Sequence, residues 1–206
     1  MKELIIFGAG GFSKSVLDSL NMNDFKIVGF IDKYKEGYHK GYPIICDKLD
    51  KIKNKGKYFY FIAIGDPSVR RDFYLEAKKY NLNIINIIDS TAIVSNNVIL
   101  GDGIYIGKMC IVNSDTEISS GVVINTRSLV EHGNFIGFCS NISTNVVLNG
   151  DVRVGECSFI GSCSVVNGQI TIGDNSTIGS GSVVIRNVPN KVVVAGSPTR
   201  LIRDIK

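Results

Sequence analysis

Residues 94–130 read VSNNVI LGDGIY IGKMCI VNSDTE ISSGVV INTRSL V, and every sixth residue is Val, Leu or Ile. The spacing continues without a slip to residue 184. A period of six fits neither an α-helix nor an ordinary strand, whose side chains repeat about every 3.6 and 2 residues. It indicates a parallel β-helix of hexapeptide repeats, in which each sixth side chain points into one core. The sixteen core positions are Val94, Leu100, Ile106, Val112, Ile118, Ile124, Val130, Ile136, Ile142, Leu148, Val154, Ile160, Val166, Ile172, Ile178 and Val184.

Small and polar residues separate the core aliphatics. The residue after a core position is often Gly or Asn, which tolerate the left-handed backbone that a tight corner requires. Three hexads form one coil of about eighteen residues, so residues eighteen apart are expected to stack at about the 4.8 Å strand spacing. By this count His132 lies on an outward corner beside Gly150, and Glu131 stacks between Asn113 and Asn149.

His132 is the one histidine of the repeat half, and it lies within a polar run that includes Glu131. Two interpretations are open on the residues alone. One is an exposed corner histidine without a role, and the other is a general base for proton transfer.

The chain divides into two parts at about residue 88. Residues 1–88 alternate between strand-like and helix-like segments, which favours a small Rossmann-like parallel α/β domain. Residues 89–206 form the β-helix, and their segment 188–202, VPNKVVVAGSPTRLI, is expected to cap its open sheet edge. The expected strands of the first part are 4–8, 26–32, 58–65 and 83–88, and the expected helices are 14–21 and 70–81.

Residues 8–13, Gly-Ala-Gly-Gly-Phe-Ser, form the turn after the first expected strand. The turn is similar to a dinucleotide-binding fingerprint but has Ser13 where the third glycine belongs. Glycines let the backbone approach a phosphate, and the amides that start the next helix face it. Asp32 ends the second strand, where such folds place an acid against a ribose hydroxyl, and Lys14 could neutralise a phosphate. A tight turn without a ligand is the alternative. The residues expected to bind a nucleotide or sugar are Gly8, Gly10, Gly11, Ser13, Lys14, Asp32 and Gly65.

The composition excludes several other classes of protein. The formal net charge of +4 is scattered, which predicts solvated faces rather than a nucleic-acid surface. No apolar run reaches about eighteen residues, so no membrane partner is expected, and the N-terminus shows no secretory signal, which favours a cytoplasmic protein. The five cysteines form no CxxC pair, so no metal is expected, and the four in the repeat are predicted to be reduced packing residues. His39 lies in segment 35–43, which Gly, Pro and charges mark as a surface loop.

Three further segments resemble one known family: FGAGGFSKS at 7–15, INTRSLVEHGN at 124–134 and VVIRNVPNKVVVAGSPTRLIR at 183–203. Together with the repeat, they are similar to the left-handed β-helix sugar acetyltransferases with a Rossmann-like N-terminal domain. Within these, the chain most resembles the bacterial sialic acid O-acetyltransferases of capsule synthesis, often called NeuD. The resemblance covers essentially the whole chain. It implies a left-handed coil, a homotrimer, and acetyl-CoA bound in the groove between two neighbouring β-helices.

The resemblance also implies roles for individual residues. The histidine of the family's Glu-His motif is here His132, which would take the proton from the attacking sugar group, and Glu131 would orient it. Nucleotide-sugar relatives seat their nucleotide at the glycine turn. Gly133 stands where N-acetylating relatives have a carboxylate, and Asn141 stands where they have a second histidine. The coenzyme contacts implied by the resemblance are Asn141, Gly150, Ser162 and Ser180.

Arg127 lies one corner before His132 and could pair with the carboxylate of a sialic acid, although an exposed corner arginine is the alternative. The expected function is acetyl-CoA-dependent O-acetylation of sialic acid, free or CMP-activated. One alternative is N-acetylation of a nucleotide-linked 4-amino sugar. The other is a non-catalytic scaffold of the sialic acid pathway, which the departures at Gly133 and Asn141 keep open.

Overall fold

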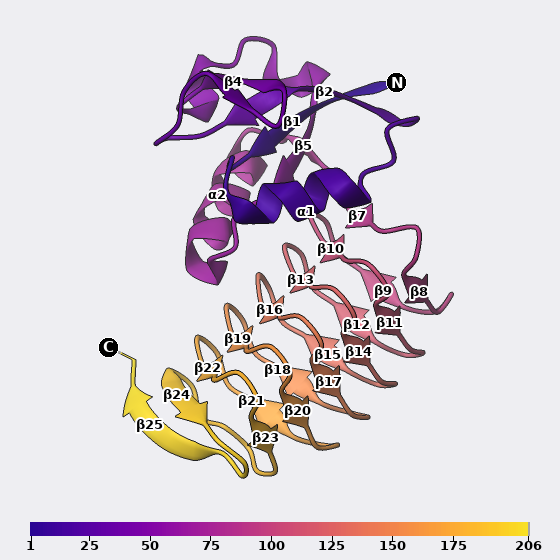
Figure 1. Ribbon diagram of the computed structural model, residues 1–206, viewed down its shortest axis with the longest axis vertical. Helices are drawn as coiled ribbons and strands as arrows, with labels where there is room; N and C mark the ends of the chain where they lie inside the picture. Colours follow the sequence, from indigo (N-terminus) through magenta and orange to yellow (C-terminus); the bar gives the residue numbers. More distant parts are fainter. Residues whose placement is uncertain (206) are drawn as a thin grey trace. The chain divides into compact units, whose positions relative to one another are not determined.

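The computed structural model describes residues 1–205 (Figure 1). The chain divides into two compact units, one spanning Met1–Ile87 and the other beginning at Ile88. Each unit has its own sheets and its own buried core. Within the described residues, no helix has both the length and the apolar character needed to cross a membrane.

The N-terminal unit is built on a six-stranded sheet with the order β3-β4-β2-β1-β5-β6. Neighbouring strands are parallel, except that β3 and β4 form an antiparallel hairpin. The strand order reverses at β1, so the loops after β1, β2 and β5 meet at one edge of the sheet. The strands are β1 (Lys2–Phe7), β2 (Phe25–Ile31), β3 (Tyr38–His39), β4 (Tyr42–Cys46), β5 (Phe59–Ile62) and β6 (Asn83–Ile84). The helices are α1 (Gly11–Ser19) and α2 (Pro67–Lys79), with short 3₁₀ turns η1 (Leu49–Lys51) and η2 (Lys55–Lys57).

The core of this unit follows from its central strand and one buried arginine. Residues 4–7 of β1 are fully buried, as an apolar parallel strand covered on both faces should be. Arg70 of α2 is buried as well, and its Nη1 donates to the carbonyl oxygens of Ile64 at 2.7 Å and Gly65 at 3.0 Å. Because a buried charge requires such acceptors, Arg70 fixes the backbone of the turn after β5.

Two segments of this unit differ from the expectation. Segment 35–43, predicted as a loop, contains β3 and the start of β4, with His39 paired to Tyr42. Segment 83–88, predicted as one strand, forms β6 and β7 (Ile87–Ile88), which belong to different sheets. The two-residue strands β3, β6 and β7 are too short to show the alternation that identifies a strand in a sequence. Strand β4 has five residues, but Pro43 within it argues against a strand in the sequence.

The second unit is a parallel β-helix of two-residue strands in three sheets (Figure 1). The sheet orders are β25-β24-β22-β19-β16-β13-β10-β7, β23-β20-β17-β14-β11-β8 and β21-β18-β15-β12-β9. Ile106 pairs with Ile124 and Val112 with Val130, so one coil has the predicted eighteen residues. The repeat strands are β8 (Ile93–Val94), β9 (Ile99–Leu100), β10 (Tyr105–Ile106), β11 (Ile111–Val112), β12 (Glu117–Ile118), β13 (Val123–Ile124), β14 (Leu129–Val130), β15 (Phe135–Ile136), β16 (Asn141–Ile142), β17 (Val147–Leu148), β18 (Arg153–Val154), β19 (Phe159–Ile160), β20 (Val165–Val166), β21 (Thr171–Ile172), β22 (Thr177–Ile178) and β23 (Val183–Val184).

The β-helix core consists of the predicted aliphatic column. All sixteen positions are buried except Val94 and Leu100, which pack partly buried against the others. Buried serines support the corners: Ser128 Oγ donates to the Ser143 carbonyl at 2.7 Å, and equivalent bonds recur in later coils. A small α/β domain followed by a parallel β-helix confirms the predicted fold class, while the left hand of the coil stays a prediction.

The segment after the repeat extends one of the three sheets. Strand β24 (Val192–Ala195) pairs in parallel with β22, and β25 (Arg200–Asp204) pairs antiparallel with β24. Buried and half-buried residues alternate along β24, whereas every residue of β25 is exposed. Of the four repeat cysteines, predicted to be packing residues, three are buried, whereas Cys163 lies at a corner and is exposed.

Candidate functional site

His132 lies exposed in the turn between β14 and β15. Its ring rests against Gly150 of the following coil: a Cβ atom at Gly150 would come within 2.6 Å of His132 Cε1 and 2.8 Å of Nε2. Only a glycine leaves room for the ring at that distance. Within the described residues no hydrogen bond engages either ring nitrogen, so a ring nitrogen is free to accept a proton from a ligand.

Glu131 forms a hydrogen bond along the stacking direction. Its Oε2 accepts from Asn113 Nδ2 at 2.9 Å, one coil earlier. Asn149, one coil later, instead donates its side-chain amide to the Val166 carbonyl at 3.0 Å. The carboxylate of Glu131 therefore has one neighbour in the ladder, and no hydrogen bond among the described residues joins it to His132.

A second carboxylate lies at the same corner. The Asp151 main-chain N–H donates to the His132 carbonyl at 2.9 Å. A Cβ atom at Gly133 would collide with Asp151 Oδ1, so the Asp151 side chain fills the space that a side chain at Gly133 would need. The two coils are thus complementary: the His132 ring lies on Gly150, and the Asp151 carboxylate lies on Gly133. Sequence analysis missed Asp151, although counting eighteen residues from Gly133 leads to it.

Other predicted residues lie on a different corner column, which joins the sheet of β16 to the sheet of β17. Arg127 is exposed there with φ +60°, and its main-chain N–H donates to the Lys108 carbonyl at 2.8 Å. Ser162 and Ser180 stack eighteen residues apart on this column, half-buried and exposed respectively. The structure therefore separates Arg127, Ser162 and Ser180 from the corner of His132 and Gly150 by one strand of the coil.

Asn141 begins β16 and leads into that second column. Its side chain is 7% exposed, and its Nδ2 donates to Ser143 Oγ at 3.3 Å. Gly150 is covered on one side by the His132 ring. Whether acetyl-CoA contacts Asn141, Gly150, Ser162 and Ser180 stays a prediction.

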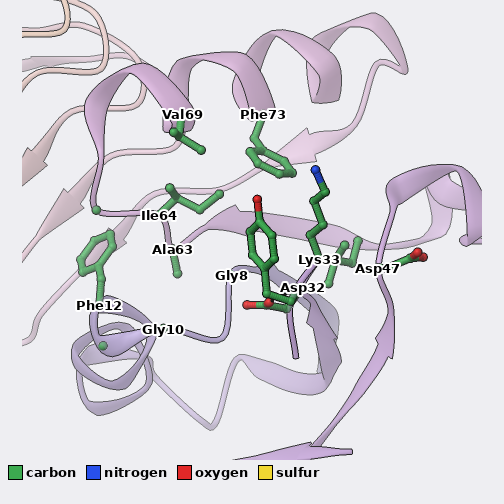
Figure 2. A pocket seen from close by; sticks show the side chains of 14 residues that line it. Gly8, Gly10, Phe12, Asp32, Lys33, Asp47, Ala63, Ile64, Val69 and Phe73 are labelled. Carbon is green, nitrogen blue, oxygen red and sulfur yellow. Dashed lines mark hydrogen bonds between the residues drawn. The ribbon is translucent and has the colours of Figure 1, made fainter. Parts of the chain in front are cut away.

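A cavity of about 400 Å³ opens at the carboxyl edge of the N-terminal sheet (Figure 2). Its walls include the predicted Gly8, Gly10, Gly11, Asp32 and Gly65. Figure 2 shows Val69 and Phe73 pointing from α2 towards the space over Ala63 and Ile64, with Asp32 on the opposite side. The apolar wall that Phe12, Val69 and Phe73 contribute was not predicted, because apolar residues on a helix read equally well as core.

The glycine turn has both the strain and the open space that ligand binding needs. Gly8 has φ +90°, and a Cβ atom there would lie 2.9 Å from the Ala63 carbonyl oxygen, so only glycine fits. A Cβ atom at Gly10 or Gly11 would meet nothing within 4 Å. Within the described residues no hydrogen bond uses the main-chain N–H of Gly10 or Gly11. Two unused donors therefore belong to residues that line the cavity at the start of α1, where an anion is stabilised.

Asp32 holds this turn to the loop after β2. Its Oδ2 accepts from the Ala9 N–H at 2.7 Å, and its Oδ1 accepts from Tyr34 N at 2.9 Å and Lys35 N at 3.1 Å. Lys35 Nζ in turn donates to the Ala9 carbonyl at 2.6 Å. The carboxylate predicted to bind a ribose is thus already engaged with the backbone: Oδ1 accepts two hydrogen bonds, and only Oδ2, which accepts one, can accept another.

Ser13 and Lys14 do not line the cavity. Ser13 is fully buried, and its hydroxyl donates to the Gly10 carbonyl at 2.8 Å and lies 2.9 Å from His39 Nε2. Lys14 is exposed on α1. The side chain of Ser13 therefore acts on the glycine turn from the protein side and cannot reach a ligand in the cavity.

His39 is half-buried rather than a free surface histidine, so that prediction is wrong. Its ring meets Phe30 edge-on at a centroid distance of 5.0 Å. Burial lowers the pKa of His39, and the positive charges of Lys35, Lys14 and Lys40 lower it further, while Asp32 acts in the opposite direction. No sequence motif links residues 13 and 39, because the β3–β4 hairpin brings them together.

Comparison with known proteins finds similarity in both units. The family described as the PglD N-terminal domain matches residues 3–77, and bacterial transferase hexapeptide repeats match residues 151–186. One curated protein, an uncharacterized protein L142 of Acanthamoeba polyphaga mimivirus, is 33% identical over 100 residues, which are 48% of this chain. The matched segment spans only 20% of that relative's length.

Solved structures match almost the whole chain. The acetyltransferase domain of PglB from Neisseria gonorrhoeae is 27% identical, with a TM-score of 0.94 over 98% of this chain and 100% of that one. It is also known in complex with acetyl coenzyme A. PerB from Caulobacter crescentus, in complex with CoA and GDP-perosamine, is 28% identical, with a TM-score of 0.90 over 98% and 97% of the chains. Neither is named as acting on sialic acid, so the narrower resemblance gains no support. Over both units, the chain is similar to hexapeptide-repeat acetyltransferases with a PglD-type N-terminal domain.

Proposed function

We propose that this protein is an acetyl-CoA-dependent N-acetyltransferase whose acceptor is an amino sugar linked to a nucleotide. The observation that carries the proposal is the exposed His132 ring, seated on Gly150 with both nitrogens unengaged within the described residues. The similarity to PerB, solved with CoA and GDP-perosamine, supports this acceptor class over sialic acid. Sialic acid O-acetylation, the first expectation from the sequence, has no such support.

His132 would act as the general base of a direct transfer. Its neutral imidazole takes a proton from the sugar amine as the nitrogen attacks the thioester carbonyl carbon. The carbon–sulfur bond then breaks, and the departing thiolate takes up that proton. An amide and the free thiol of CoA are the products, so atoms and charge balance.

Asp151 is better placed than Glu131 to assist this histidine. One oxygen of Glu131 already accepts from Asn113, whereas no hydrogen bond to the Asp151 carboxylate occurs among the described residues. Its carboxylate lies against Gly133, the residue that follows His132, and would stabilise the positive charge that develops during the transfer. Asp151 would thus supply from the following coil the carboxylate that Gly133 lacks.

The N-terminal cavity would hold the nucleotide. The free N–H groups of Gly10 and Gly11 suit a phosphate, and the apolar wall around Phe12 and Phe73 suits the flat face of a base. Coenzyme contacts at Asn141, Gly150, Ser162 and Ser180, a substrate contact at Arg127 and the homotrimer belong to the same proposal. Light scattering of the purified protein tests the trimer.

An acceptor screen tests the proposed reaction. Purified protein is incubated with acetyl-CoA and, separately, GDP-perosamine, other nucleotide-linked 4-amino sugars, sialic acid and CMP-sialic acid. The expected product is an acetylated amino sugar whose acetyl group survives mild alkali, as an amide does and an ester does not. His132→Ala should lower kcat by about 10² to 10⁴-fold. An alkali-labile product formed only from sialic acid, or a His132→Ala variant with full activity, would overturn the proposal.

A further inference from the structure

A three-membered hydrogen-bond chain runs behind the glycine turn of the N-terminal unit. His39 Nε2 lies 2.9 Å from Ser13 Oγ, and Ser13 Oγ donates to the Gly10 carbonyl at 2.8 Å. Ser13 is 0% exposed, so no water or ligand competes for its hydroxyl. The chain therefore links the β3–β4 hairpin to the first residue before α1.

The direction of the hydrogen bonds follows from the single hydroxyl proton. Because Ser13 gives that proton to the Gly10 carbonyl, its oxygen must accept from His39, whose Nε2 then carries a hydrogen. The edge-on contact with Phe30 holds the His39 ring in place. A donor at the position of His39 Nε2 is thus the chemical requirement of the chain, whether the ring is neutral or protonated.

The hydrogen-bond chain ends at the carbonyl of Gly10, a residue that lines the cavity. Gly10 has no side chain to cap α1, and its backbone angles, φ −90° and ψ −161°, are extended. The hydrogen bond to its carbonyl restrains the planar peptide that joins Gly10 to Gly11, and the N–H of Gly11 belongs to that same peptide. Asp32 and Lys35 hold the preceding residue, Ala9, from the other direction.

We propose that His39, acting through Ser13, is a positioning residue that sets the affinity of the glycine turn for the phosphate groups of a nucleotide. The proposal rests on the proposed function, because it assumes that the N-terminal cavity binds the nucleotide part of the acceptor. His39 touches neither the ligand nor the reacting atoms. It should therefore affect binding of the nucleotide sugar without affecting the acetyl-transfer step.

Two substitutions at residue 39 separate the hydrogen bond from the rest of the ring. His39→Leu removes the donor, whereas His39→Gln keeps an amide N–H at the position of Nε2. We expect His39→Leu to raise KM for GDP-perosamine, or for the acceptor found in the screen, about fivefold, the usual worth of one hydrogen bond. kcat and KM for acetyl-CoA should stay within about twofold, and His39→Gln should restore acceptor KM to within about twofold of wild type.

A double-mutant cycle with Ser13 tests that the two residues act together. Ser13→Ala should raise acceptor KM as His39→Leu does, and the double variant should be no weaker than either single variant. Tyr38→Phe is the matched control, because Tyr38 is the exposed neighbour in the same strand and should leave acceptor KM unchanged. If His39→Leu folds poorly, its melting temperature reveals it, and Ser13→Ala alone then decides.

The outcomes separate this inference from the proposed function. Calorimetric titration of the wild type with GDP, and with the acceptor found in the screen, comes first. If the wild type binds neither GDP nor the acceptor, and Gly10→Val has the same acceptor KM as the wild type, the cavity does not bind the nucleotide. That result overturns both the nucleotide assignment and this inference. A wild type that binds the nucleotide, with His39→Leu and Ser13→Ala both at wild-type affinity, overturns only the role of His39. If the increases in acceptor KM from His39→Leu and Ser13→Ala add up in the double variant, the two residues act independently, which also overturns the hydrogen-bond chain.

Discussion

The two units hold their candidate site residues by different means. In the β-helix, the backbone ladder places His132: its carbonyl accepts from the main-chain N–H of Asp151, and its ring rests on Gly150. In the α/β unit, side chains place the glycine turn, with Asp32 bound to Ala9 and Ser13 bound to Gly10. We therefore expect added volume to damage the first site and lost polar groups to damage the second.

The largest effect is expected where volume is added under the histidine. Gly150→Ala places a methyl group against the ring, and the displaced base should lower kcat about 100-fold, since misplacement by about 1 Å costs that much. Steady-state kinetics with acetyl-CoA and the acceptor measure it. Gly56→Ala is the control, because a Cβ atom there would meet nothing within 4 Å and Gly56 lies outside both candidate sites; kcat should stay within about twofold. Equal kcat in both variants would contradict the conclusion that packing against Gly150 positions the His132 ring.

The next effect is expected from removal of the carboxylate behind the glycine turn. Asp32→Ala leaves the N–H groups of Ala9, Tyr34 and Lys35 without their acceptor. The free energy of unfolding should fall by about 2 kcal/mol, and acceptor KM should rise about tenfold. Chemical denaturation and steady-state kinetics measure the two quantities. Asp32→Asn keeps one oxygen acceptor, so its free energy of unfolding and its acceptor KM should lie between those of the wild type and Asp32→Ala. Wild-type values of both quantities for Asp32→Ala would contradict the role of this side chain.

A smaller effect should distinguish two carboxylates of one corner column. Asp151 and Asp115 both have a left-handed backbone, with φ +61° and +59°, which asparagine also adopts readily. Asp115 Oδ1 accepts from Asn97 Nδ2 at 2.6 Å and serves as the matched control. Asp151→Asn should lower kcat about fivefold, as expected for removal of an exposed charge at the corner of the base. The same change in Asp115→Asn would show that the effect is general charge.

The smallest effect concerns pH and stability in the α/β unit. Since burial and nearby lysines lower the pKa of His39, the fold favours the neutral ring. Its contribution to stability is complete above the unfolded value of 6.5 and declines as the pH falls through that value towards the lower folded pKa. Melting temperatures of wild type and His39→Gln between about pH 8 and 5 should therefore converge or cross on the acid side. A constant difference across that range would contradict the shift.

The sequence predicted the β-helix more fully than the α/β unit, for a physical reason. In the repeat, a period of eighteen converts position in the sequence directly into stacking, so the contact of Glu131 with Asn113 could be predicted by counting. The same count contained Asp151 beside Gly133. The count does not predict which side-chain conformer a residue adopts. Asn149, for example, donates to the Val166 carbonyl and not to the Glu131 carboxylate.

In the α/β unit, position in the sequence says less about proximity. The glycine turn and the acid at the end of β2 were predicted because they follow strand ends. His39 was missed because its approach to Ser13 depends on a hairpin whose first strand, β3, has two residues. Arg70 shows the same limit: a charged helical residue normally faces solvent, yet its buried guanidinium holds Ile64 and Gly65.

The eighteen-residue register also limits how the β-helix can change in length. Removal of one full turn, for instance residues 155–172, would join Val154 to Gly173 and return every later side chain to the same face. Removal of six residues would rotate all that follows onto a different sheet, and removal of one would exchange inside for outside. Deletions within the repeat that preserve the core are thus restricted to whole coils of eighteen residues. A relative that lacks one whole coil C-terminal to Gln169 would keep His132, Gly150 and Asp151 in contact.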